Sequence, residues 1–355
     1  MKLQTLVLGI CLLILGGCSD FGFYWQAASG HLDLLSRKQD IQELIRNPET
    51  KAELSRKLKL VLEVREFAVS HLSLPNQPGY KGYVDLGRPY VTMIVRAAPA
   101  LKFEAYQWCF WFVGCQEYRG YFDAVEAKSY ATGMEEGLDV SVRPVSAYST
   151  LGWLNGSWIP NYFSDPVLST FVNRKDPDLV ATLIHEMAHQ VVYVKNDTSF
   201  NESFATFVEE EGLEQFYRGQ KGSKASELIW YHSAKRDREY FRQLVLDAYR
   251  KLETLYGLTL SDREKLQKKD QIFNQLKETF TQKKKEFEVL NYSKWFSQDL
   301  NNTHMLGIRR YQRDTEAFRK LFKNHDRKWD AFFAKVLELA EQSKENRQML
   351  LNQKL

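Results

Sequence analysis

The sequence contains little cysteine, no excess of either charge and no long hydrophobic run. Four cysteines in 355 residues exclude a mini-protein that depends on disulfide staples, because a chain of this length buries its own core. The 49 Lys and Arg nearly balance the 45 Asp and Glu, which leaves a formal net charge of +4. Charge therefore gives no reason to expect a nucleic-acid partner. The hydrophobic fraction of 44% excludes a disordered chain.

The longest apolar stretch lies at the start of the chain. Residues 6–15 are apolar, follow Lys2 and precede Gly16-Gly17-Cys18-Ser19. About ten apolar residues are too few to span a bilayer but suit the core of an export signal. Leu15-Gly16-Gly17-Cys18 resembles a bacterial lipobox, whose cysteine becomes lipid-modified; the alternative is an ordinary secretory signal with an incidental Cys18. We predict a signal peptide over residues 1–17 and a lipid anchor at Cys18, in the bacterial cell envelope and facing the periplasm. Ser19 in place of aspartate favours the outer membrane.

Two cysteines remain after the signal and the lipidation site are set aside. In an oxidising compartment Cys109 and Cys115 are expected to form a disulfide that clips a hairpin or loop. The alternative is a pair of reduced cysteines buried among the neighbouring aromatic residues.

The hydrophobic pattern predicts a predominantly helical α+β fold. Helical spacing dominates residues 23–72, 225–256, 261–289 and 315–351, whereas residues 90–95, 101–112 and 138–145 have the composition of strands. A short helix is expected at 123–134. We divide the chain into a signal (1–17), an N-terminal helical segment (18–85), a catalytic core with a small antiparallel sheet (86–220) and a C-terminal helical portion packed on that core (221–355).

The most specific motif lies on a helix predicted to start at Asp176-Pro177. Asp176 is expected to be its N-cap, with proline in the first turn. The helix continues into His185-Glu186-Met187-Ala188-His189. Residues four apart lie on one helix face, so both imidazoles can reach one metal ion while Glu186 stands beside them. This is the motif of the zincin metallopeptidases.

A third ligand follows from the geometry of a helix pair. A turn is predicted near residue 196, and a second helix at 202–211. His189 lies seven residues before the turn and Glu202 six after it, so each is about 10 Å along its helix. In an antiparallel pair the two residues are level. Two histidines and Glu202 then leave one position open for water, as in a catalytic zinc site.

This region resembles known zinc peptidases. Asn201-Glu202-Ser203-Phe204-Ala205 is similar to the Asn-Glu-Gly-Phe-Ala segment of the gluzincin aminopeptidases, although the separation of 202 − 189 = 13 residues is shorter than theirs. A wider resemblance is to bacterial lipoproteins described as predicted zinc aminopeptidases. It also includes Gly120-Tyr121-Phe122, residues 147–153 and Leu300-Asn301-Asn302.

The resemblance implies a role for each residue of the site. His185, His189 and Glu202 would bind one Zn²⁺ per chain, and Glu186 would be the general base. A hydroxyl donor for the oxyanion is also needed, and its candidates are Tyr148, Tyr193 and Tyr311. Asn201 and Glu209 would orient the ligands; the alternatives are a helix cap and a solvated helix face.

Substrate recognition is less specified. Gly133-Met134-Glu135-Glu136 invites comparison with the segment that binds the substrate amine in alanyl and leucyl aminopeptidases, but two of five motif positions differ and the segment resembles a helix end. A strand within residues 142–158, with Gly152 and Gly156, is the better candidate to align a peptide. An acidic residue must also bind the free ammonium. Glu135, Glu136 and Asp139 are unplaced candidates, and Glu209 is expected to be too far from the metal.

These features predict a zinc aminopeptidase with a zincin-like core, acting on peptides and attached to the membrane through its lipid. The alternatives are a zinc endopeptidase or murein-peptide hydrolase, or a non-catalytic scaffold lipoprotein.

Overall fold

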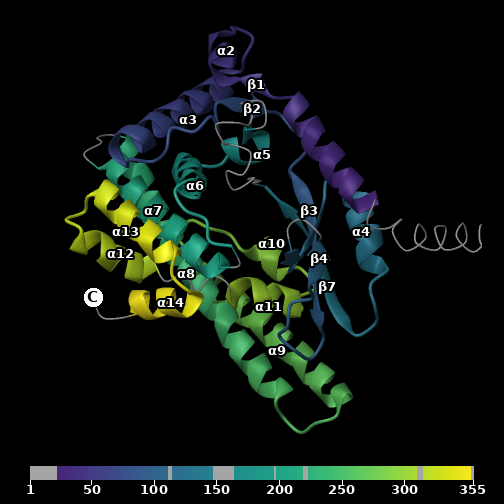
Figure 1. Ribbon diagram of the computed structural model, residues 1–355. Coiled ribbons are helices and arrows are strands. Elements are labelled where there is room, and N and C mark those ends of the chain that lie inside the picture. Colours follow the sequence, from purple (N-terminus) through teal and green to yellow (C-terminus); the bar gives the residue numbers. More distant parts are fainter. Residues whose placement is uncertain are drawn as a thin grey trace, which may run out of the picture.

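The computed structural model describes residues 22–110, 114–146, 164–195, 197–218, 223–309 and 315–352. Within these ranges the chain is predominantly helical with small sheets whose strands are antiparallel except for the pair β2–β8, so the predicted α+β class is confirmed. Figure 1 shows a helical body on one side, a sheet on the other and a pair of long helices below both. Among the described residues, no helix is both long and apolar enough to cross a bilayer.

The helical body collects segments from the whole chain. Its apolar core, which includes Leu34, Phe204 and Phe332, draws on every element of this body except α14. The elements are a helix over residues 22–36, α2 (Ile41–Arg46), α3 (Ala52–His71), α5 (Ser169–Val172), α6 (Asp176–Ala188), α7 (Thr198–Tyr217), α12 (Thr315–Asn324), α13 (Trp329–Ala340) and α14 (Lys344–Asn352). The predicted single helix over 315–351 is therefore wrong. Asp326 and Arg327 have positive φ angles of 54° and 56°, which end α12 and turn the chain back.

The main sheet has the strand order β6-β3-β7. All pairs are antiparallel, and β3 (Thr92–Pro99) lies between β6 (Arg119–Tyr121) and β7 (Leu138–Val145). The strand predicted at 138–145 is confirmed. In the region predicted as a strand at 101–112, only β4 (Trp108–Phe110) is a strand among the described residues, and residues 101–107 are irregular.

The two faces of this sheet differ, because successive side chains of a strand point to opposite faces. One face carries Met93, Val95 and Ala97, which belong to an apolar cluster with Ala127 of α4 (Ala124–Thr132). The opposite face packs against α11 (Asn302–Arg309) through polar side chains, as in the bond from Thr303 Oγ1 to Ser141 Oγ at 2.7 Å. The sheet therefore has an apolar face and a polar face.

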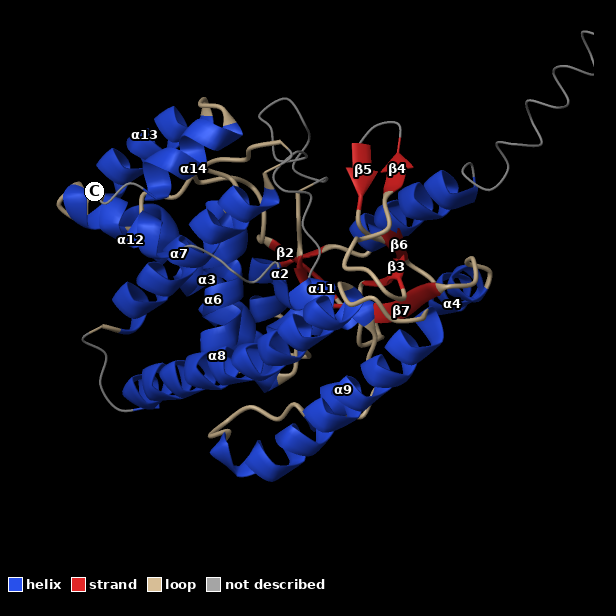
Figure 2. Cartoon of the chain, turned by 90° about the horizontal axis from the view of Figure 1, so that it is seen from below, coloured by secondary structure: helices blue, strands red, loops and turns tan. Residues whose placement is uncertain are grey.

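Two smaller sheets complete the β-structure. β1 (Gln39–Asp40), β2 (Gly82–Val84) and β8 (Val167–Leu168) form one of them. The other is a hairpin of β4 with β5 (Gly114–Gln116), in which Cys109 faces Cys115 and the two form a disulfide. Figure 2 shows this hairpin projecting from the edge of the main sheet.

A second helical unit lies below the sheet. Its elements are α8 (Ser223–Tyr256), α9 (Asp262–Lys283), the short 3-10 helix η2 (Lys284–Glu286), α10 (Ser293–Phe296) and α11. The four α-helices share a separate apolar core. A polar cluster joins this unit to the sheet: Asp139 Oδ2 accepts bonds from Lys269 Nζ at 2.6 Å and from Asn302 N at 2.7 Å. The division into domains predicted from the sequence stays a prediction.

Candidate metal centre

Helix α6 begins as the sequence predicts, but a different interaction holds its start. Pro177 occupies the first turn, whereas the N-cap is Lys175 and has no side-chain cap bond. The prediction that Asp176 caps the helix is wrong. Its carboxylate instead binds Arg56 and Lys57 of α3, each at 2.6 Å. The first turn is thus anchored to a neighbouring helix.

The connection between α6 and α7 is held from two sides. The side chain of Asn201 both accepts from Val194 N and donates to Val194 O, at 2.8 Å in each case. Asp197 caps α7 and pairs with Arg347 of α14 at 2.7 Å, and both of these side chains are buried. Asn201 therefore braces the connection that brings the two helices side by side.

The three predicted ligands converge where α6 and α7 face each other. Their ligand atoms all lie within 4.8 Å of one another. His185 Nε2 is 3.5 Å from one oxygen of Glu202, and His189 Nε2 is 3.6 Å from the other. Ligands about 2.1 Å from a tetrahedral zinc are about 3.4 Å apart, so the donor types and spacings fit this ion. The Glu202 side chain is 31% exposed and that of His189 only 3%, which leaves the solvent side open to water or substrate.

Glu209 lies behind the first histidine. Its Oε2 accepts a bond from His185 Nδ1 at 3.0 Å, and this leaves Nε2 facing Glu202. Burial lowers the pKa of His185, but the hydrogen bonds to Glu202 and Glu209 outweigh burial and raise it to about 10. An imidazole among carboxylates requires a positive charge nearby, which either a proton or a metal ion can supply.

The structure adds Arg174 to the surroundings of Glu186. Arg174 precedes α6, donates to Thr182 Oγ1 at 3.1 Å, and also binds Ser146 Oγ just beyond β7. Burial lowers the pKa of Arg174, while the charges of Asp178 and Glu186 raise it. A guanidinium therefore lies within electrostatic range of Glu186 and joins α6 to the end of the sheet. No sequence motif marks this residue, because Ser146 is 28 residues away.

The remaining predicted residues fall into two groups. Cys18, Tyr148, Tyr311, Gly152 and Gly156 lie outside the described residues. Among the others, Tyr193 is in the connection after α6 and is 41% exposed, and Glu135 and Glu136 are exposed in the turn before β7.

Asp139 is committed to Lys269 and Asn302, so its carboxylate is already neutralised. The resemblance to the amine-binding segment is also not supported by the secondary structure, since α4 ends at Thr132 with Gly133 as its C-cap.

Comparison with known proteins places the chain in a family. Residues 22–351, which include α6, α7 and the main sheet, match a family model described as "Putative aminopeptidase". The chain belongs to this family. Membership supports a peptidase function. No curated protein and no solved structure matches the chain.

Proposed function

We propose that this member of the aminopeptidase family is a zinc-dependent hydrolase of peptide bonds. One observation carries the proposal: the ligand atoms of two imidazoles and a carboxylate lie within 4.8 Å of one another, with Glu209 behind one of the imidazoles. His185, His189 and Glu202 would hold the ion.

The chemistry follows from the positions of the acidic side chains. A bound zinc ion lowers the pKa of a coordinated water and polarises the scissile carbonyl. Glu186 follows His185 on α6 and acts through charge on both His185 and Arg174. Its carboxylate accepts the proton of the attacking water and passes it to the leaving amine. Glu209 fixes the tautomer of His185, so that Nε2 carries the lone pair offered to the metal.

The test separates metal binding from proton transfer. In Glu186→Gln we expect one zinc per chain, because residue 186 is not a ligand, and a fall in kcat of at least about 100-fold, the lower bound for a lost general base. The double variant His185→Ala/His189→Ala should lose both zinc and activity. Metal analysis and peptide hydrolysis are measured on the same samples, with circular dichroism as the check on folding. Stoichiometric zinc in the double variant, or full turnover in Glu186→Gln, would contradict the proposal.

We further propose that the enzyme removes residues from free N-termini, in line with the family description. Unblocked peptides and aminoacyl amides should be cleaved, whereas N-acetylated peptides should resist. Comparable internal cleavage of N-acetylated peptides would assign an endopeptidase instead, and preference for murein peptides would assign a murein-peptide hydrolase.

Attachment to the envelope is proposed from the sequence alone. Fractionation of Cys18→Ser, compared with the unaltered chain, tests it: the variant should leave the membrane fraction. A variant that sediments with membranes as before would rule out Cys18 as the anchor.

A further inference from the structure

The helix over residues 22–36 is fixed to the main sheet by its inner face. The side chain of Gln26 bridges two backbone groups at the end of β6: its Nε2 donates to Gly120 O and its Oε1 accepts from Phe122 N, both at 3.1 Å. A Cβ added at Gly30 would collide with the ring of Phe122, so the helix backbone and this ring are in close contact. The helix therefore has a defined orientation in the fold.

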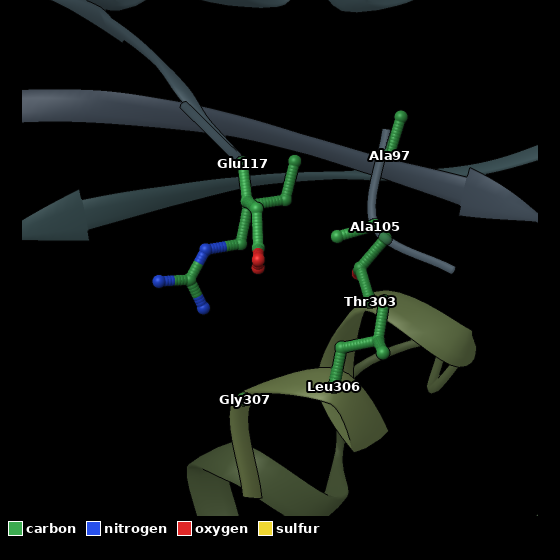
Figure 3. Close-up of a pocket in the computed structure, with 7 residues that line it drawn as sticks. Ala97, Ala105, Glu117, Thr303, Leu306 and Gly307 are labelled. Atoms are coloured by element: carbon green, nitrogen blue, oxygen red, sulfur yellow. The ribbon is translucent and has the colours of Figure 1, made fainter. Parts of the chain in front are cut away.

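This helix packs on the apolar side of the main sheet. Phe23 stacks on Phe110 of β4, with ring centroids 5.0 Å apart, and the guanidinium of Arg119 lies 4.1 Å from the centroid of the Phe23 ring. Figure 3 shows the opposite side of the sheet, where Thr303 and Leu306 of α11 point toward it. Figure 1 shows the helix, in purple, along the outer side of the molecule with one end beside α4. The helix therefore has an outer face that points away from the sheet.

The outer face is exposed and carries no charge. Trp25 is 66% exposed and Leu32 is 52% exposed, and Ala28 and Ser29 between them are also exposed. These four residues, here called the outer stripe, are spaced i, i+3, i+4 and i+7 and so lie along one side of the helix. Residues 21–32 contain no Asp, Glu, Lys or Arg, although 26% of the whole chain is charged. A helix face in contact with water usually carries charged side chains, so the outer stripe has the composition of a covered surface.

The outer stripe begins close to the proposed lipid anchor. Three residues separate Cys18 from Gly22, the first described residue of the helix. An extended chain spans at most about 3.6 Å per residue, so Gly22 lies within about 14 Å of Cys18. Trp25 follows about 5 Å further along the helix axis. A lipid on Cys18 would therefore hold the start of the outer stripe at the membrane surface.

We propose that the outer stripe is a membrane-docking surface, which lies in the interfacial region of a lipid bilayer. This inference rests on the proposed attachment through Cys18, and the same attachment favours a bilayer over a second copy of the chain as the partner. Tryptophan and tyrosine prefer the membrane interface, and Tyr24 beside the stripe is 37% exposed. Because the stripe is uncharged, uncharged lipids suffice. Since the helix is fixed to the sheet, docking sets the orientation of the whole protein on the membrane.

A label on the outer stripe tests this surface in the lipid-anchored protein. Cys109 and Cys115 form a disulfide, Cys18 would carry the lipid and Cys11 would leave with the signal, so Ser29→Cys supplies a single thiol for a fluorophore. In phosphatidylcholine vesicles, lipids with a nitroxide on the acyl chain should quench this fluorophore at a depth of about 5–10 Å, as for an interfacial helix. High salt should not release it, because no charge holds it there.

Two matched controls accompany the label. Ser70→Cys on α3 replaces another exposed serine whose hydroxyl, like that of Ser29, donates to a carbonyl one turn earlier, and its label should stay in water. Leu32→Asp should move the label at residue 29 toward water, because a carboxylate resists burial in lipid. Leu337→Asp changes a leucine of α13 with a similar exposure of 46% and should not. Thermal stability should change little in either aspartate variant, since both leucines are exposed.

The outcomes separate docking from attachment. If Cys18 carries lipid but the labels at residues 29 and 70 are equally open to water, docking is overturned and the attachment stands. A label at residue 29 that is shielded from aqueous acrylamide, yet not quenched by the nitroxide lipids, would assign the stripe to a contact between copies of the chain and would also overturn docking. If mass spectrometry finds no lipid on Cys18, both attachment and docking are overturned, whereas the proposed zinc peptidase function is unaffected.

Discussion

One half-buried and one buried histidine in this protein have opposite electrostatic environments. His185 in the candidate metal centre lies among Glu186, Glu202 and Glu209, and its pKa is raised to about 10. His304 lies in the polar cluster between the sheet and α11. Burial first, and then the charge of Arg143, lower its pKa to about 3. The first environment favours a positive charge and the second excludes one.

The first is a candidate binding site, whereas the second is the structural contact between the sheet and α11, here called the joint. In the cluster between the sheet and α11, donors and acceptors are matched within the protein: Asn302 Nδ2 donates to the carbonyls of Pro99 and Ala100 at 2.9 and 3.0 Å. In the candidate metal centre, the carboxylate of Glu202 faces both imidazoles and Glu209 accepts a bond from His185, so the acidic groups favour a positive charge, carried by a proton or by a metal ion. The Leu300-Asn301-Asn302 segment, noticed in the sequence for its resemblance to a family pattern, thus belongs to the joint.

The largest expected effect in this comparison is on the joint. Asp139→Ala should lower the free energy of unfolding by about 3–5 kcal/mol, because Lys269, whose side chain is 6% exposed, would remain buried without its carboxylate. Urea denaturation measures the loss, and the exposed Glu136→Ala is the control. Where Asp139→Ala does not fold, Asp139→Asn retains an acceptor and should lose less. Equal stability of the Asp139 and Glu136 variants would show that this cluster does not hold the sheet.

A smaller effect is expected behind the metal ligands. Glu209→Gln should weaken zinc binding about 10- to 100-fold by loosening His185, with little change in the stability of the metal-free protein. Competition with a chelator measures the affinity. Glu214→Gln on the same helix, which pairs with His232 instead, should bind zinc normally, and a matching loss there would show that the effect is general.

The smallest expected effect concerns acid. The pKa of His304 is about 3 in the folded protein, against an ordinary 6.5. As the pH falls, His304 is therefore protonated in the unfolded chain before it is protonated in the folded one. Stability contributed by the neutral ring is complete above pH 6.5 and is lost as pH falls toward 3. At pH 5 the free energy of unfolding is lowered by about 2 kcal/mol for this reason. The difference in unfolding free energy between pH 7 and pH 5 should therefore shrink in His304→Asn. His325→Asn should leave it unchanged, and an equal shift in both variants would disprove the assignment.

Local patterns predicted the elements that matter for the site, and they failed where distant contacts decide. The helix pair and the strand at 138–145 follow from spacing and composition within short windows. Asp176 was misassigned as a cap because its partners, Arg56 and Lys57, are about 120 residues away in the sequence. The expectation of one helix over 315–351 failed at residues 323–328, six consecutive polar residues that interrupt the apolar spacing where the backbone turns.

The sequence by itself determined which residues can form the candidate metal centre. A spacing of four places two histidines on one helix face, and a short turn sets Glu202 level with them; both consequences follow from helix geometry alone. Only the tertiary structure decided what surrounds them: that Glu209 reaches His185 and that Arg174 joins α6 to the sheet. The first kind of information is contained in neighbouring residues. The second exists only after segments from both ends of the chain pack together, as Arg347 does with Asp197 across 150 residues.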